Sequence, residues 1–295
     1  MRIKSLELRA KSVVEGFQNG LNRSPYHGFS VEFTEYRQYS LGDDPRYLDW
    51  KLYARTDKYY IKLYEDETNL RCQLLLDLSR SMGYGSLEFP KIEYARTLAA
   101  TFAYFLSTQR DAVGLLTFDE RVNEFIPARY RVGHLRRLMV ALERKTAGTA
   151  TDINRPLQEA ADRLNKRGMV VLISDLLAPI DALQANLGFL RARGQEVVVF
   201  QILDPAEMNF EFDQESMFED LETGKKVYVD PSTARDFYLE RFNQHQEAIR
   251  RTCEKLGIMY RRFSTDQPME LILSEFLRAR QSVAGRRVRA RGGRS

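Results

Sequence analysis

The sequence predicts an α/β protein built on a doubly wound, mostly parallel sheet. From residue 70 onward, short apolar runs alternate with longer segments of helical periodicity, which is the pattern of repeated strand and helix units. The run at 70–77 is almost continuously apolar, as expected of a parallel strand buried on both faces. A length of 295 residues with 43% hydrophobic residues suffices for a large core and excludes a disordered or collagenous chain.

The amino-terminal part predicts a helix followed by two strands that flank a shorter helix. Apolar residues recur at helical spacing over 2–18. Residues 31–40 alternate as in a strand, and a second strand is expected over 59–66. Between these strands, Asp44 caps a short helix whose first residue is Pro45, and Trp50 on this helix is expected to pack onto the body of the protein.

The remaining elements follow from the alternation of periods 2 and 3.6. Strands are expected at 70–77, 112–118, 122–126, 169–174, 196–203 and 258–263. Helices are expected at 90–109, 132–145, 153–166, 180–193, 233–256 and 268–280. Residues 205–231 interrupt the pattern with a hairpin, Ser216–Leu221 and Lys225–Val229, that turns on Glu222-Thr223-Gly224.

The net charge of +4 conceals an uneven distribution. Residues 278–295 contain seven arginines and no acid, and removing these seven charges leaves the rest of the chain at −3. The body is therefore mildly acidic with a basic tail, which argues against a uniformly basic nucleic-acid-binding domain. The tail itself is a candidate for nucleic-acid or anionic-lipid binding, or a solvated disordered extension.

The cysteine count and hydropathy bear on the compartment. Cys72 and Cys253 lie far apart within regular elements, so no disulfide or thiolate metal framework is expected. The charged amino terminus lacks an apolar core, and no window approaches 18 uninterrupted apolar residues. We therefore expect a cytoplasmic protein without a membrane span.

Three polar loops follow predicted strands, at 77–83, 147–152 and 174–177. Ligands of open α/β sheets bind outside the carboxyl ends of the strands, so these loops are where chemistry is expected. In the first loop, Asp77, Ser79 and Ser81 place oxygen atoms at alternate positions, which suits a hard cation such as Mg²⁺ if the chain turns tightly. The alternative is that one of the serines simply caps the next helix.

The other two loops are less specific by themselves. Thr149 and Thr151 supply hydroxyl groups directly before a helix, where Thr151 or Asp152 also serves as an ordinary N-cap. Asp175 follows the apolar strand 169–174, and an acidic residue is common at such a strand end. Either loop is explained without a ligand when it is considered alone.

Together the three loops resemble the metal-ion-dependent adhesion site of von Willebrand factor A (vWA) domains. That pattern is Asp-x-Ser-x-Ser after the first strand, a threonine in a Gly-Thr loop and an aspartate after a later buried strand. It corresponds here to Asp77, Ser79, Ser81, Thr149 with Thr151 as its competitor, and Asp175. The resemblance covers about residues 70–280 and implies the doubly wound, Rossmann-like vWA fold, a bound Mg²⁺ or similar divalent cation, and recognition of an acidic side chain from a protein partner.

A second resemblance precedes the first. Glu32-Phe33, Arg37, Tyr39, Gly42-Asp43-Asp44, Arg46, Leu48-Asp49-Trp50, Ala54-Arg55, Lys62 and Glu65 resemble the signature of a bacterial family called domain of unknown function 58 (DUF58). In that family the signature precedes a vWA-like region, and the genes typically lie beside those of MoxR-type AAA+ ATPases. The resemblance therefore implies a partner or adaptor of such an ATPase.

The role of the signature residues has two interpretations. The acids and arginines among them form a bridged scaffold cluster, or they form a binding surface, because mixtures of Arg, Asp, Tyr and Trp are typical of interface hot spots. The candidate partner-binding residues are Arg37, Asp43, Asp44, Arg46, Asp49, Trp50 and Arg55.

Enzyme signatures are missing from the sequence. It contains no phosphate loop, no Gly-x-Ser-x-Gly and no His-Glu-x-x-His, and its three histidines are scattered, with His134 and His245 expected on partly exposed helix surfaces. The sequence therefore predicts a metal-dependent interaction protein, with a Mg²⁺-dependent hydrolase and nucleic-acid binding through the tail as alternatives. The expected organisation is a signature region at 1–69, a vWA-like domain at 70–280 and a disordered tail at 281–295.

Overall fold

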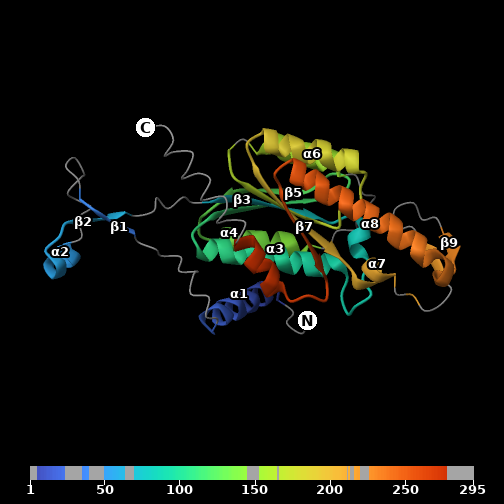
Figure 1. Ribbon diagram of the computed structural model, residues 1–295, viewed down its shortest axis with the longest axis horizontal. Coiled ribbons are helices and arrows are strands. Elements are labelled where there is room, and N and C mark those ends of the chain that lie inside the picture. The colour runs from blue at the N-terminus through green and yellow to red at the C-terminus, as the bar shows by residue number, and fades with distance from the viewer. Residues whose placement is uncertain are drawn as a thin grey trace. The chain divides into compact units, whose positions relative to one another are not determined.

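The computed structural model describes residues 5–23, 35–39, 50–63, 70–144, 153–164, 166–210, 212, 216–219 and 226–277 (Figure 1). The chain divides into two compact units, of which the smaller is residues 18–69 and the larger comprises the rest. The Arg-rich tail at 278–295 and the threonine loop at 145–152 lie outside the described residues.

The larger unit contains a six-stranded sheet with the order β10-β7-β6-β3-β4-β5. Its strands are β3 (Arg71–Asp77), β4 (Ala112–Phe118), β5 (Val122–Arg129), β6 (Met169–Ser174), β7 (Glu196–Leu203) and β10 (Met259–Ser264). All neighbours pair in parallel except β4 and β5, which are antiparallel. The predicted α/β fold with a mostly parallel sheet is confirmed.

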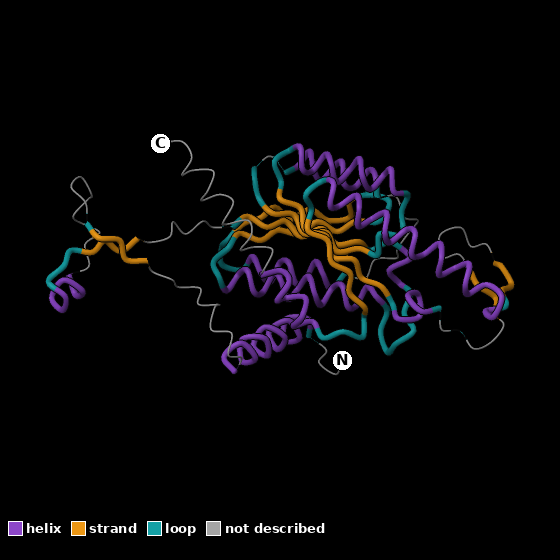
Figure 2. The backbone as a smooth tube through the Cα atoms, in the orientation of Figure 1, coloured by secondary structure: helices purple, strands orange, loops and turns teal. Residues whose placement is uncertain are grey.

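Helices cover both faces of this sheet (Figure 2). They are α1 (Leu6–Arg23), α3 (Lys91–Thr108), α4 (His134–Glu143), α5 (Asn154–Arg163), α6 (Ile180–Ala192), α7 (Pro205–Asn209), α8 (Pro231–Lys255) and a final helix at 269–277. On one face, Phe102 of α3 contacts Phe200 of β7 and Phe276 of the final helix. On the other face, Leu157 of α5 and Leu187 of α6 share a buried cluster with the sheet.

The path of the chain through the sheet creates one topological switch point. After β3 the chain adds β4 and β5 on one side, and it then returns to place β6, β7 and β10 on the other. The loops that follow β3 and β6 therefore leave the same edge in opposite directions. Such a crevice at the carboxyl ends of parallel strands is the usual ligand site of an open α/β sheet.

Helix α1 packs on the larger unit along one stripe. Leu6, Ala10, Val14 and Phe17 are buried at helical spacing, and the Leu6 amide donates to Oε1 of Glu143 at 3.3 Å. Residues 1–69 were predicted to form one region. The structure instead groups the helix up to Phe17 with the large sheet and separates residues 18–69 from it.

The smaller unit contains a two-stranded antiparallel sheet and one helix. Strand β1 (Glu35–Gln38) pairs with β2 (Tyr60–Leu63), and α2 (Trp50–Thr56) lies between them in the chain. Trp50 was predicted to pack onto the body, which stays a prediction; within the smaller unit its side chain is 61% exposed. The indole instead meets Tyr53 edge-on at 6.3 Å, and Tyr53 stacks on Tyr59 at 4.5 Å.

One short helix was not predicted, whereas the predicted hairpin is confirmed. The five-residue helix α7 was not predicted, although Asp204 caps it and Pro205 begins it. The predicted hairpin is present as β8 (Ser216–Glu219) and β9 (Lys226–Val229). Among the described helices, none is long and apolar enough to cross a bilayer.

His134 was predicted to be partly exposed, and this is wrong. The residue is only 4% exposed, and its ring Nε2 lies 2.7 Å from the carbonyl oxygen of Val113. Burial lowers the pKa of His134, which favours the neutral ring with Nε2–H as the donor. Its place in a helical segment suggested a surface position, but the ring turns inward to the β4 backbone.

Candidate metal centre

The two aspartates of the predicted cation site meet at the switch point of the sheet. Asp77 is the last residue of β3, and Asp175 directly follows β6, which pairs with β3. The two residues are 1% and 0% exposed. Strand register thus brings together two carboxylates that lie far apart in the sequence and removes both from water.

The Asp77 loop leaves its strand in a tight turn. Oδ1 of Asp77 accepts from the Ser79 amide at 2.8 Å, and Oδ2 accepts from the Ser174 hydroxyl at 2.5 Å. The Ser79 and Ser81 hydroxyl oxygens lie 3.1 Å apart. Ser79 precedes the 3₁₀ helix η2 (Arg80–Gly83) but makes no side-chain capping bond to it, so simple capping does not account for its hydroxyl.

Asp175 is held by a buried lysine. Nζ of Lys91, at the start of α3, lies 2.9 Å from Oδ2 of Asp175 and 2.6 Å from Oε1 of Glu207. The Lys91 side chain is fully buried. The remaining oxygen of the Asp175 carboxylate, Oδ1, accepts from the Leu177 amide at 3.3 Å, while Gln201 donates to the Asp175 carbonyl at 2.7 Å. Lys91 and the Leu177 amide therefore orient the carboxylate, and Gln201 holds the main chain of the same residue.

Sequence reasoning missed Lys91, Ser174, Asp204 and Glu207. Asp204 follows β7 at the same edge, so the rule that selects loops after strands was sufficient to find the Asp204 and Glu207 segment. Asp204 accepts from the Ser86 amide at 2.8 Å and forms a capping box with Glu207. Lys91 had no such signal, because it lies at the start of a helix and not in a loop that follows a strand.

The electrostatics of this centre favour an added positive charge. Burial and, to a lesser extent, the charge of Asp175 together raise the pKa of Asp77 to about 6, against the opposing effect of its hydrogen bonds from Ser174 and Ser79. Burial by itself would lower the pKa of Lys91, but the charges of Asp175 and Glu207 outweigh it and raise that pKa. Lys91 therefore stays charged, as the one ammonium group among the carboxylates Asp77, Asp175 and Glu207.

The donor set fits a hard divalent cation. In an octahedral Mg²⁺ site with bonds of about 2.1 Å, neighbouring ligand atoms are about 3.0 Å apart. The 3.1 Å between the hydroxyls of Ser79 and Ser81 matches that edge. No cluster of three or more His, Cys, Asp or Glu with metal-binding geometry occurs in the described part of the chain. The fit therefore rests on two carboxylates with hydroxyl ligands.

Of the other predicted site residues, only some lie within the described part of the chain. Thr149 and Thr151 lie outside the described residues, as do Asp43, Asp44, Arg46 and Asp49. Arg37 is described only in its backbone, within β1. Trp50 and Arg55 are exposed on α2 of the smaller unit.

Comparisons with known proteins confirm the family that the signature between Glu32 and Glu65 predicted. The family described as "Protein of unknown function DUF58" matches residues 35–249. The chain is 26% identical over 287 residues to an uncharacterized protein of Mycobacterium bovis, Mb1516, covering 96% of this chain and 90% of that protein. It is 27% identical over 155 residues to an uncharacterized protein of Mycobacterium avium, MAV169, covering 52% of this chain and 90% of that protein.

Two solved structures to which this chain is similar are the following. An aerotolerance-related membrane protein from Bacteroides fragilis aligns with a TM-score of 0.48 at 15% identity, covering 71% of this chain and 99% of that chain. The VWA domain of SpRpn10 aligns with a TM-score of 0.43 at 11% identity, covering 70% of this chain and 95% of that chain. Since both scores are below 0.5, the fold rests on the strand order of this chain and not on these likenesses.

Proposed function

The chain belongs to the DUF58 family of proteins of unknown function, and we propose that it is a protein-interaction adaptor that binds its partner through a divalent cation. The cation, Mg²⁺ or a similar ion, lies at the carboxyl edge of the large sheet. An acidic side chain of the partner completes its coordination shell. The observation that supports this proposal is that Asp77 and Asp175 are buried at the ends of adjacent strands, with the Ser79 and Ser81 hydroxyls beside Asp77.

The ligand charges explain why such a site recognises a carboxylate. Two carboxylates and neutral hydroxyls leave a hard cation with residual positive charge and an exchangeable position. Asp77, Ser79 and Ser81 hold the cation, and Thr149 is the proposed threonine ligand, with Thr151 as its competitor. When bound, Mg²⁺ supplies the coordination position that an acidic residue of the partner occupies.

Lys91 positions Asp175 in this scheme. Its ammonium group holds Oδ2 of Asp175 at 2.9 Å and links that carboxylate to Glu207. A buried charge is tolerated when an opposite charge lies against it with good geometry. Lys91 therefore holds the Asp175 carboxylate in place and offsets its negative charge.

The proposed partner is a MoxR-type AAA+ ATPase that offers an acidic residue. The signature residues of the smaller unit supply a second contact surface, and among them Trp50 and Arg55 are exposed. Large aromatic side chains and arginines are the residues most enriched at interface hot spots. This surface is independent of the cation, so the two contacts have separable tests.

A pull-down of the full chain with the cognate ATPase tests the metal-dependent contact. We expect Mg²⁺ to support binding, and EDTA or Asp77→Asn to reduce it at least tenfold. Asp162→Asn is the matched control, because it removes an exposed carboxylate at the opposite edge of the sheet. Binding that survives both EDTA and Asp77→Asn unchanged contradicts the proposal, whereas loss only with Trp50→Ala assigns the interaction to the smaller unit.

A further inference from the structure

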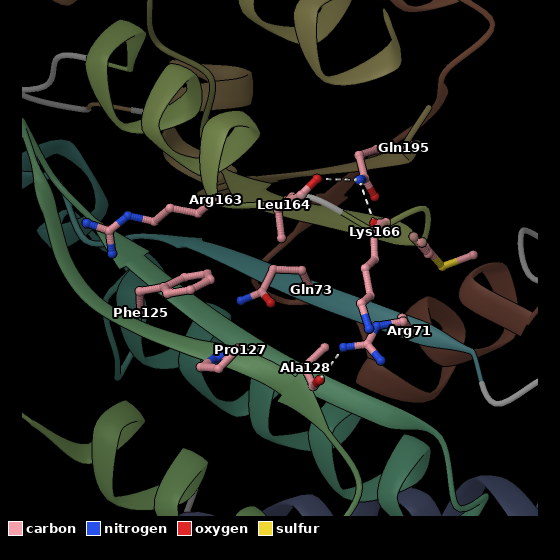
Figure 3. Close-up of a pocket in the computed structure, with 11 residues that line it drawn as sticks. Arg71, Gln73, Phe125, Pro127, Ala128, Arg163, Leu164, Lys166 and Gln195 are labelled. Atoms are coloured by element: carbon pink, nitrogen blue, oxygen red, sulfur yellow. Dashed lines mark hydrogen bonds between the residues drawn. The ribbon is translucent and has the colours of Figure 1, made fainter. Parts of the chain in front are cut away.

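A cavity opens at the amino edge of the large sheet, opposite the carboxyl edge at which the metal centre lies. Its volume is ≈ 210 Å³. It is bounded by the start of β3, the end of β5, the end of α5 and the start of β6 (Figure 3). The cavity forms where α5 ends at Arg163, because the helix covers the sheet only up to that residue. It shares no lining residue with the metal centre.

The lining of this cavity is basic. Arg71, Arg163 and Lys166 contribute three cationic side chains, and no aspartate or glutamate lines it. Arg71 uses Nη2 to donate to the Ala128 carbonyl at 2.9 Å, which leaves its other guanidinium donors for a ligand. Arg163 pairs with Glu159 and lies over the Phe125 ring at 5.2 Å. The amino edge thus has the opposite charge to the carboxylate-rich metal centre.

A buried polar side chain also lines this cavity. Gln73 is 3% exposed, and its Nε2 donates to the Ile126 carbonyl at 3.3 Å. Its Oε1 is buried against Gly114. Figure 3 shows Gln73 in the middle of the lining residues. Because this position holds a neutral amide, a glutamate there would add a negative charge to the lining.

We propose that this cavity binds a phosphate monoester. The phosphate group carries close to two negative charges at pH 7 and accepts from several donors, which suits Arg71, Lys166 and Arg163 acting together. The uncharged part of the ligand lies against Phe125 and Pro127, the apolar side chains of the β5 wall. A free nucleotide and a lipid headgroup both offer this chemistry.

Calorimetric titration of the full chain in EDTA tests the proposal, with AMP, inorganic phosphate and adenosine as probes. We expect AMP to bind, adenosine to bind at least tenfold more weakly, and added salt to weaken AMP binding. Vesicles with and without phosphatidic acid, a lipid phosphate monoester, form the second arm. Binding of AMP assigns a soluble ligand, and binding of phosphatidic acid vesicles alone assigns a lipid headgroup. If native protein binds neither, the proposal is wrong.

Matched variants locate the site. Arg71→Gln and Lys166→Gln should each weaken binding of the probe about tenfold or more, because each removes a charged hydrogen bond to the phosphate. Arg136→Gln removes the same charge from exposed α4, outside the cavity, and should change binding less than twofold. Gln73→Glu places a carboxylate in the cavity and should abolish binding in protein that still melts cooperatively. If all four variants bind the probe with the affinity of the native protein, the proposal is wrong. Asp77→Asn should leave AMP binding unchanged, so failure of this proposal is distinct from failure of the metal site.

Discussion

Replacing Lys91 by methionine should unfold the metal-free protein at a markedly lower temperature. The ammonium group is fully buried between Asp175, also fully buried, and Glu207, whose side chain is 16% exposed. Removing one partner of a buried ion pair leaves an uncompensated charge and costs about 3–5 kcal/mol. For a domain of this size, each kcal/mol shifts Tm by about 2–4 °C, so the melting temperature should fall by roughly 6–20 °C.

Thermal melts monitored by circular dichroism in EDTA provide the measurement. Lys11→Met is the matched control, because the Lys11–Glu15 pair on α1 is exposed, with Nζ and Oε1 3.6 Å apart, and such pairs contribute at most about 1 kcal/mol. Lys91→Met combined with Asp175→Leu should be more stable than Lys91→Met alone, because both charges are then gone. A Tm for Lys91→Met within 2 °C of the native value refutes the reasoning.

Three further predictions concern other parts of the chain. Mg²⁺ at about 100 times its Kd should stabilise the native protein by about 2.7 kcal/mol in denaturant titrations, and Asp77→Asn should remove this gain; stabilisation that persists in the variant argues for another site. Gly114→Ala should lower the free energy of unfolding by about 1–3 kcal/mol, because the added Cβ would collide with Oε1 of Gln73 and with the β5 backbone. The control is Gly16→Ala at an exposed position on α1, which should be neutral or stabilising. Burial raises the pKa of Cys253 to about 12, so alkylation by iodoacetamide at pH 8 should be at least about 100-fold slower in the native protein than in urea; comparable rates contradict its burial.

Most elements of the large sheet were predictable because local chemistry determines them. The strands at 112–118, 169–174 and 196–203 are runs of apolar residues with polar ends, and the structure places them at the predicted residues. The direction of β5 was not predicted. The connection from β4 to β5 spans only residues 119–121, which is too short for a parallel crossover and long enough for a hairpin.

The candidate metal centre was likewise predictable only in part. Asp77 and Asp175 were identified because each follows a buried strand, and loops after parallel strands share one edge of a sheet. The wider polar network was not predicted, since Lys91 contacts Asp175 and Glu207 across separations of 84 and 116 residues. No local pattern encodes contacts at such separations.

The sequence by itself determined which residues follow strands, which faces are apolar and to which family the chain belongs. The tertiary structure decided which charges lie together: Lys91 with the acids of the metal centre, and Arg71, Arg163 and Lys166 around a basic cavity at the other edge. The reason is physical, because strand and helix formation depend on neighbours in the chain. Coulombic and hydrogen-bond energies depend instead on distances that only the packing of the whole sheet and its helices sets.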